Sequence, residues 1–275
     1  MANTIKLGNG NWATKEGSLL AYNDENNNFK PLPFTTTRAS SATVVNKQGL
    51  IETVGSGIPR IDFSDDANGA LLLENSSTNL ITYSEDFTQV SFYDLINDVT
   101  VETSAIISPR GTTGVQELRE NIDLDDHLIK SVVTFTETDS SFSIFAKYKG
   151  NNRNIKLSLG SGKYASFDLQ NGTYFDVQTS TVAKIESYSN GWYRCSINGS
   201  ISVSKLNIIL LNNTTEIYQG DGASGVYIWG SQFEQGSYAT SYIPTQGSAQ
   251  TRVADTASGS GNSTVINSSE GVLYA

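Results

Sequence analysis

The chain of 275 residues has 18 Lys and Arg against 28 Asp and Glu, which gives a formal net charge of −10. The basic residues form no cluster, which argues against nucleic-acid binding because neutralising phosphates requires a basic patch. No apolar run approaches the roughly 20 residues of a membrane-spanning helix, which argues against membrane insertion. The single cysteine, Cys195, allows neither an intrachain disulfide nor a cysteine metal cluster, and we expect it to be a small buried side chain.

The composition is typical of an all-β protein. Charged residues make up only 17% of the chain, and the abundant Val, Ile, Tyr, Gly, Ser, Thr and Asn favour strands and turns over helices. At this length we expect one main domain with flanking pieces. The start, Met-Ala-Asn-Thr-Ile-Lys, lacks the pattern of a signal peptide, so we expect a protein made in the cytoplasm and released by lysis.

Residues 1–80 are predicted to form short strands without a core of their own. A hairpin is expected over residues 37–54 with its turn at 46–49, followed by strands near 58–63 and 69–74. Intertwining of several chains would bury the apolar positions of this segment, so we expect a homo-oligomer, a trimer in preference to a dimer. The alternative is that these strands add a layer to the main domain.

Residues 81–245 are predicted to form a jelly-roll β-sandwich. Alternating strands are expected at 141–149, 191–203 and 226–234. The last strand would place Val226, Ile228, Gly230 and Gln232 on one face and Tyr227, Trp229, Ser231 and Phe233 on the other. The pair Asn171-Gly172 predicts a hairpin with a type I′ turn.

Residues 246–275 are expected to be a linker followed by the start of a further strand or domain. Arg38 and Arg252 begin similar Thr-Arg segments. We expect them either to pair with acids across a subunit interface or to lie on the surface with little effect.

Four segments carry a family resemblance. They are residues 37–43 (Thr-Arg-Ala-Ser-Ser-Ala-Thr), residues 73–87 with Asn-Leu-Ile-Thr-Tyr-Ser-Glu-Asp-Phe, residues 191–195 (Gly-Trp-Tyr-Arg-Cys), and residues 227–245 with Tyr-Ile-Trp-Gly-Ser-Gln-Phe-Glu and Ala-Thr-Ser-Tyr-Ile-Pro-Thr. Together they resemble the head-fibre and tail-fibre proteins of tailed bacteriophages. The resemblance implies a structural fibre or spike subunit located in the virion, attached to other virion proteins through residues 1–80 and displaying a sandwich that binds a receptor or host surface glycan.

The order of the strands is also similar to that of jelly-roll carbohydrate-binding modules of bacteria. This second resemblance implies an alternative function, the binding module of a bacterial polysaccharide-degrading system. It further implies a structural calcium ion held by Glu85, Asp86 and Glu234, since calcium prefers carboxylate and carbonyl oxygens. The acidic pair that closes those modules is replaced here by Trp229-Gly230.

No catalytic group of residues stands out, and we expect no enzyme activity. His127 is the sole histidine, and its acidic surroundings suggest a solvated loop rather than a catalytic triad. The adjacent acids Asp125 and Asp126, or Glu85 and Asp86, would face opposite ways on a strand and so would not form an acid and base pair.

A ligand is expected to contact aromatic rings, because sugar C–H faces stack on tyrosine while polar groups bind the hydroxyls. The candidate contacts are Tyr148, Tyr164, Tyr174 and Tyr188, which lie near polar neighbours on or beside the middle strands. Trp192 and Trp229 are expected to be core residues.

Overall fold

The computed structural model describes residues 35–96, 99–132, 135, 139–201 and 205–258, together with the backbone of four earlier strands. Those strands are β1 (Thr4–Ile5), β2 (Asn11–Lys15), β3 (Leu19–Asn23) and β4 (Phe29–Pro31). The chain divides into two compact units. The first combines Met1–Ser76 with Arg252–Ala275, and the second is Ser77–Thr251.

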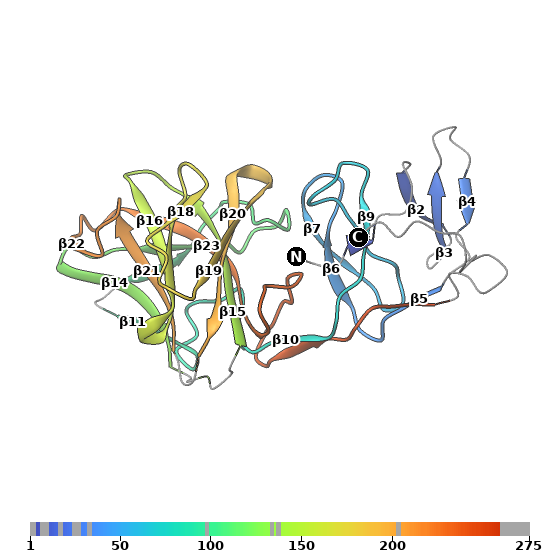
Figure 1. The fold of residues 1–275 in the computed structure, drawn as a ribbon. Coiled ribbons are helices and arrows are strands. Elements are labelled where there is room, and N and C mark those ends of the chain that lie inside the picture. Colours follow the sequence, from blue (N-terminus) through green and yellow to red (C-terminus); the bar gives the residue numbers. More distant parts are fainter. Residues whose placement is uncertain are drawn as a thin grey trace. The chain divides into compact units, whose positions relative to one another are not determined.

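The second unit consists of two antiparallel sheets (Figure 1). Sheet I contains, in spatial order, β12 (Thr100–Thr103), β13 (Gln116–Arg119), β23 (Gly225–Gln235), β15 (Asp139–Tyr148), β20 (Trp192–Ser200) and β19 (Val182–Tyr188). Sheet II contains β11 (Tyr93–Ile96), β14 (Leu124–Ser131), β21 (Leu206–Asn212), β16 (Arg153–Leu159), β17 (Tyr164–Asp168) and β18 (Thr173–Phe175), and β22 (Ile217–Gln219) also pairs with β14.

The order of eight strands identifies the jelly roll that the sequence predicts. In chain order these strands are β13, β14, β15, β16, β17, β20, β21 and β23. Sheet I then pairs the first with the eighth, the eighth with the third and the third with the sixth, while sheet II pairs the second, seventh, fourth and fifth in that order. This alternation of the chain between two four-stranded sheets is the jelly-roll arrangement.

The core lies between the sheets and follows the two-residue period of the strands. Ile155 and Leu157 of sheet II, like Ile144 and Ile197 of sheet I, are fully buried in one apolar cluster. Cys195 belongs to the same cluster, which confirms the prediction for this residue.

A bulge in β23 changes the predicted faces of that strand. Gly230 has φ of 63°, and the pairing with β15 shifts between Ser143 and Phe145. Because the bulge inserts one extra residue, Phe233 points into the core, whereas Trp229 lies on the outer face with Phe145. The prediction that Phe233 and Trp229 share a face was therefore wrong.

The type I′ turn occurs elsewhere than predicted. Asn151 and Asn152 both have positive φ, 57° and 56°, and connect β15 to β16. At the predicted position only Gly172 has positive φ, 68°. The turn between β17 and β18 is longer than two residues because Asp168 accepts hydrogen bonds from the backbone of Gln170 and Asn171.

The first unit contains the predicted hairpin, β6 (Ala42–Val45) paired with β7 (Ile51–Val54). It also contains β5 (Thr35–Thr37), β8 (Ile61–Asp62), β9 (Ala70–Leu72) and β25 (Thr256–Ser258). Strand β25 pairs with β5, so a segment from the end of the chain completes the unit. The short strands β10 (Ser77–Asn79) and β24 (Gln250–Arg252), which belong to the second unit except for Arg252, pair with each other.

A buried ion cluster holds this late segment. Arg38 lies 2.8 Å from Asp255, Arg60 lies 2.7 Å from Glu74 and also bonds Asp255, and Arg252 lies 3.5 Å from Glu74. Arg38 and Arg252 therefore pair with acids of their own chain, which corrects both expectations for them. The division into units also corrects the linker predicted from residue 246. Gln246–Thr251 belongs to the sandwich, and Arg252 onward belongs to the first unit. Most of the predicted terminal strand lies outside the described residues.

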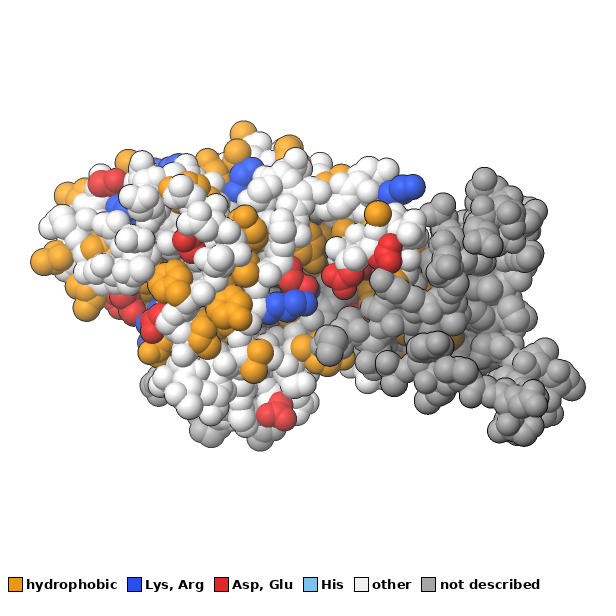
Figure 2. All heavy atoms as spheres, turned by 45° about the horizontal axis from the view of Figure 1, so that its top comes forward, with side chains coloured by type: hydrophobic (Ala, Val, Ile, Leu, Met, Phe, Trp, Pro, Cys, Tyr) orange, Lys and Arg blue, Asp and Glu red, His pale blue; other side chains and the backbone are white. Residues whose placement is uncertain are grey.

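Two observations concern surface charge and membrane-spanning helices. Figure 2 shows lysine and arginine side chains scattered over the visible face, with no basic patch. Within the part of the chain that the structure describes, no helix has the length and apolar character needed to cross a membrane.

Candidate functional site

The outer face of sheet I is covered by the chain itself. Trp192 and Trp229 lie there with exposed fractions of 0% and 1%, which confirms that they are core residues. The indole Nε1 of Trp192 donates to the carbonyl of Ile107 at 2.9 Å, and the ring of Tyr242 packs 4.8 Å from that of Trp229. Two separate segments thus cover this face and leave no open platform of aromatic rings around these two tryptophans.

A buried polar network joins residues of two segments that resemble the phage proteins, 73–87 and 227–245. Asn79 donates to the carbonyls of Ser231 and Ile243 and accepts from the backbone N–H of Ile81 and Phe233. This one amide therefore ties the segment before the sandwich to both β23 and the segment that follows it.

Glu234 extends this network. Its carboxylate accepts hydrogen bonds from the hydroxyl of Ser77 at 2.5 Å, the amide of Gln232 at 2.6 Å and the backbone N–H of Thr240 at 2.9 Å. Since a buried carboxylate must find such partners, Glu234 already has a structural role. These motif residues maintain the fold rather than form a binding site.

The outer face of sheet II combines a small apolar cluster with polar side chains. Register places Leu128, Ile209, Lys156, Ser166 and Phe175 in one row across five strands. Leu128 and Ile209 form a small buried cluster with Leu211, and Phe175 packs against it. The side chains around this cluster are polar and partly exposed.

Lys156 is at the centre of this face. Its ammonium lies 2.9 Å from Glu216, 3.6 Å from Asp176 and 3.9 Å from the centroid of the Tyr164 ring. The side chains of Asp176 and Glu216 are 54% and 38% exposed, so water and ligands reach them. We refer to Lys156, Tyr164, Asp176 and Glu216 as the Lys156 cluster. The alternation of residues 153–159 places Lys156 opposite the core, but no motif marks the cluster in the sequence.

The next row on the same face adds neutral hydrogen-bonding groups. Asn207 and Ser158 lie between Lys130 and Tyr164 in register. An amide, a hydroxyl, carboxylates and an aromatic ring therefore occur together on one sheet face, and these are the groups that bind sugars.

The four predicted tyrosines do not come together. Tyr164 lies in the Lys156 cluster. Tyr148 packs against the core, and Tyr188 lies against Phe145 on the covered face of sheet I. Tyr174 is 50% exposed, but its position opposite the core residue Phe167 places it on the other side of the sheet from Tyr164.

The three carboxylates of the expected calcium site are also separate. Asp86 accepts from Gln116, which lies opposite Ile228 near the start of β23. Glu234 lies near the end of that strand, roughly 20 Å further on at about 3.3 Å per residue. Glu85 accepts from the hydroxyl of Tyr242 at 3.0 Å. Among the described residues, no group of three His, Cys, Asp or Glu side chains has an arrangement that could hold a metal ion.

His127 is not in a solvated loop. It lies within β14 with an exposed fraction of 0%, and its ring packs 4.8 Å from that of Tyr218. Tyr218 in turn donates to Glu120, whose carboxylate also pairs with Arg153 at 2.6 Å. The expectation failed because Asp125 and Asp126 belong to the same strand as His127, β14. The residues of that strand from His127 onward are mostly buried.

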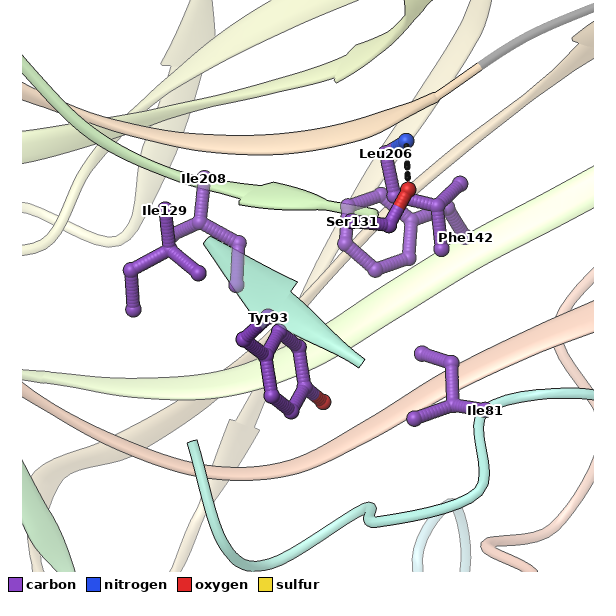
Figure 3. Close-up of a pocket in the computed structure, with 7 residues that line it drawn as sticks. All are labelled: Ile81, Tyr93, Ile129, Ser131, Phe142, Leu206 and Ile208. Atoms are coloured by element: carbon purple, nitrogen blue, oxygen red, sulfur yellow. Dashed lines mark hydrogen bonds between the residues drawn. The ribbon is translucent and has the colours of Figure 1, made fainter. Parts of the chain in front are cut away.

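A cavity between the sheets is too small for a ligand. Its volume is about 10 Å³, at the lower limit of the roughly 10–15 Å³ that one water molecule needs. Figure 3 shows the mainly apolar lining, in which Ser131 accepts a hydrogen bond from the backbone of Leu206 at 2.9 Å. The lining residues are Ile81, Tyr93, Ile129, Ser131, Phe142, Leu206 and Ile208.

Comparison with protein-family models and with curated proteins gives no match. A solved structure that the chain resembles is that of TmCBM27, a carbohydrate-binding module with specific mannan recognition. The sequence identity is 11% and the TM-score 0.31, over 60% of this chain and 98% of that chain. A likeness of this degree does not identify a ligand.

Proposed function

We propose that the sandwich is a non-catalytic carbohydrate-binding module whose ligand lies on the outer face of sheet II. The Lys156 cluster is the observation that carries the proposal. It combines an aromatic ring, an ammonium and two exposed carboxylates, beside a row with an amide and a hydroxyl. The chain's own segments cover the outer face of sheet I, which makes sheet II the better candidate.

The chemistry of the face suits a sugar. A pyranose ring offers apolar C–H groups to Tyr164 and Phe175 and hydroxyls to Asn207, Asp176 and Glu216. Sites of this kind fix orientation through a few polar groups on a preformed surface. Strands of a packed sheet supply that rigidity.

Tyrosine substitutions in the complete chain test this proposal. We expect Tyr164→Ala to weaken glycan binding at least tenfold, about 1.4 kcal/mol, measured by calorimetry against a glycan first identified on an array. Tyr174→Ala is the matched control, since Tyr174 is the more exposed residue on the adjacent strand but faces the other way. Loss of binding in the control alone would place the ligand elsewhere.

A second candidate is a fibre or spike subunit of a tailed-bacteriophage virion, in which this module would contact the host surface. The four resembling segments favour it. On this reading the first unit attaches to other virion proteins and the chain forms a homo-oligomer, a trimer in preference to a dimer. Mass spectrometry of purified particles tests the location, and detection only in infected-cell lysate would count against it. Light scattering tests the oligomer.

A further inference from the structure

The outer face of sheet II carries an excess of negative charge, and this determines which glycans it can accept. Resting on the proposed function, we infer that the site binds glycans without acidic groups and rejects those that carry carboxylate, sulfate or phosphate. The residues that set this specificity are Asp176 and Glu216, which pair with Lys156, and Asp126, which lies opposite Ile217, the neighbour of Glu216.

Acidic side chains outnumber basic ones across the face. Register and alternation place Asp94, Asp126 and Asp168 on it, and ion pairs with Lys156 add Asp176 and Glu216. Against these five carboxylates the strands contribute two lysines, Lys130 and Lys156. Lys205, one residue before β21, adds a third cation at the far end, so acids still outnumber bases by five to three.

The charge of Lys156 is matched by acids of this chain, and Lys130 has an acid opposite it on the neighbouring strand. The ammonium of Lys156 lies between Glu216 at 2.9 Å and Asp176 at 3.6 Å and rests on the Tyr164 ring. Lys130 lies directly opposite Asp94 in the pairing of β14 with β11. A carboxylate on a sugar would therefore have to compete with Asp176 and Glu216 for Lys156.

The surroundings of Asp126 indicate the same negative field. Burial raises the pKa of its carboxyl group, and the nearby Asp125 and Glu216 raise it further. Asp168 responds differently: burial acts to raise its pKa, but hydrogen bonds from Asn171 and Gln170 outweigh that effect and lower it. Asp168 therefore stays charged at neutral pH. An acidic glycan would meet repulsion along the whole face, as in the exclusion of a wrong partner by like charges.

An amino sugar is repelled only by the lysine cations of this face, which the carboxylates outnumber. The Lys156 cluster already holds one ammonium between two carboxylates and an aromatic ring, the arrangement that favours cations at exposed sites. Neutral and amino-bearing glycans are therefore the accepted class.

The test compares matched glycans on the complete chain. An array holding neutral, amino-bearing, uronate-bearing, sialylated and sulfated glycans is probed in low salt, and the affinities of the hits are measured by calorimetry. We expect every hit to be neutral or amino-bearing, with acidic counterparts bound at least tenfold more weakly. Raising the salt to about 0.5 M should reduce that difference, because the charges are exposed and become screened.

A double variant tests the named residues. Asp176→Asn with Glu216→Gln frees Lys156 and should raise the affinity for an acidic counterpart at least tenfold relative to wild type. Glu186→Gln, which lies on sheet I and pairs only with Lys184 among the ion pairs of the described residues, is the control and should leave the preference unchanged. A melting curve of each variant checks folding.

The outcomes separate the two ideas. Preferred binding of an acidic glycan by the wild type overturns the inference but leaves the proposed function standing. An unchanged preference in the folded double variant overturns the role of Asp176 and Glu216. Absence of binding to every class overturns the proposed function and the inference with it.

Discussion

The guanidinium of Arg38 donates to the carboxylate of Asp255 at 2.8 Å, although 217 positions separate the two residues in the sequence. Asp255 also accepts from Arg60 and from the backbone N–H of Glu74. A single carboxylate near the end of the chain thus pairs with two buried arginines near its beginning. The attachment of the late segment to the first unit therefore depends on Asp255.

Asp255→Asn should lower the free energy of unfolding of the first unit by about 3–5 kcal/mol, the usual cost of breaking a buried ion pair by removing one partner. Denaturant titration of the complete chain measures the loss. Asp65→Asn, at an exposed position of the same unit, provides the control. Equal stability of the two variants would contradict the role of the cluster.

The same carboxylate predicts acid sensitivity. Burial acts to raise the pKa of Asp255, but hydrogen bonds from Arg60 and Arg38 and the charge of Arg60 outweigh it and hold the pKa below its ordinary value of 3.8. A folded pKa below the unfolded value means that stability is present above the unfolded pKa and is lost as pH falls through the folded pKa. We expect destabilisation of the first unit to begin near pH 4, and the Asp255→Asn variant to lack this component when both are melted between pH 7 and 3.

Asn79→Ala should cost the sandwich at least about 3 kcal/mol, since it leaves two carbonyls and two N–H groups buried without their partner. Asn171→Ala, in the exposed turn between β17 and β18, should cost far less. Thermal melting distinguishes them, and a small effect at Asn79 would mean that water replaces its amide.

Gly230→Ala tests the bulge. The φ of 63° disfavours any residue with a Cβ, and an added Cβ would lie 3.0 Å from Phe145 and 3.3 Å from Tyr242. We expect a loss of about 1–3 kcal/mol. Gly162→Ala is the control, because nothing lies within 4 Å of its added Cβ. A neutral Gly230 variant would show that the strand realigns without the bulge.

Cys195 should resist alkylation in the folded protein. Burial raises the pKa of its thiol well above the ordinary value, so thiolate is scarce and reagents have no access. Mass spectrometry after iodoacetamide should find modification only when denaturant is present. Rapid labelling in native buffer would reveal opening of the sandwich core.

Local patterns predicted much of this fold and little of its site. Alternation and turn residues located the strands around Phe145, Trp192 and Ile228, because a half-buried strand has an intrinsic period of two. The same rule misplaced Phe233, since the bulge at Gly230 depends on the pairing with β15. The prediction for His127 was wrong because the burial of β14 depends on its pairing with β21 and β22, which come much later in the sequence. Lys156, Asp176 and Glu216 come from separate elements, and only the folded sheet brings them together.

The place where the sandwich begins and ends has a consequence for how the two units can be separated. It starts at Ser77 and finishes at Thr251, and the hydroxyls of Thr78 and Thr251 lie 2.8 Å apart. A domain whose entry and exit are adjacent can be inserted into a host or removed from it without separating the host's own segments. The ion-paired first unit is built from residues on both sides of the sandwich, so another domain could replace Ser77–Thr251 without dividing the first unit in space.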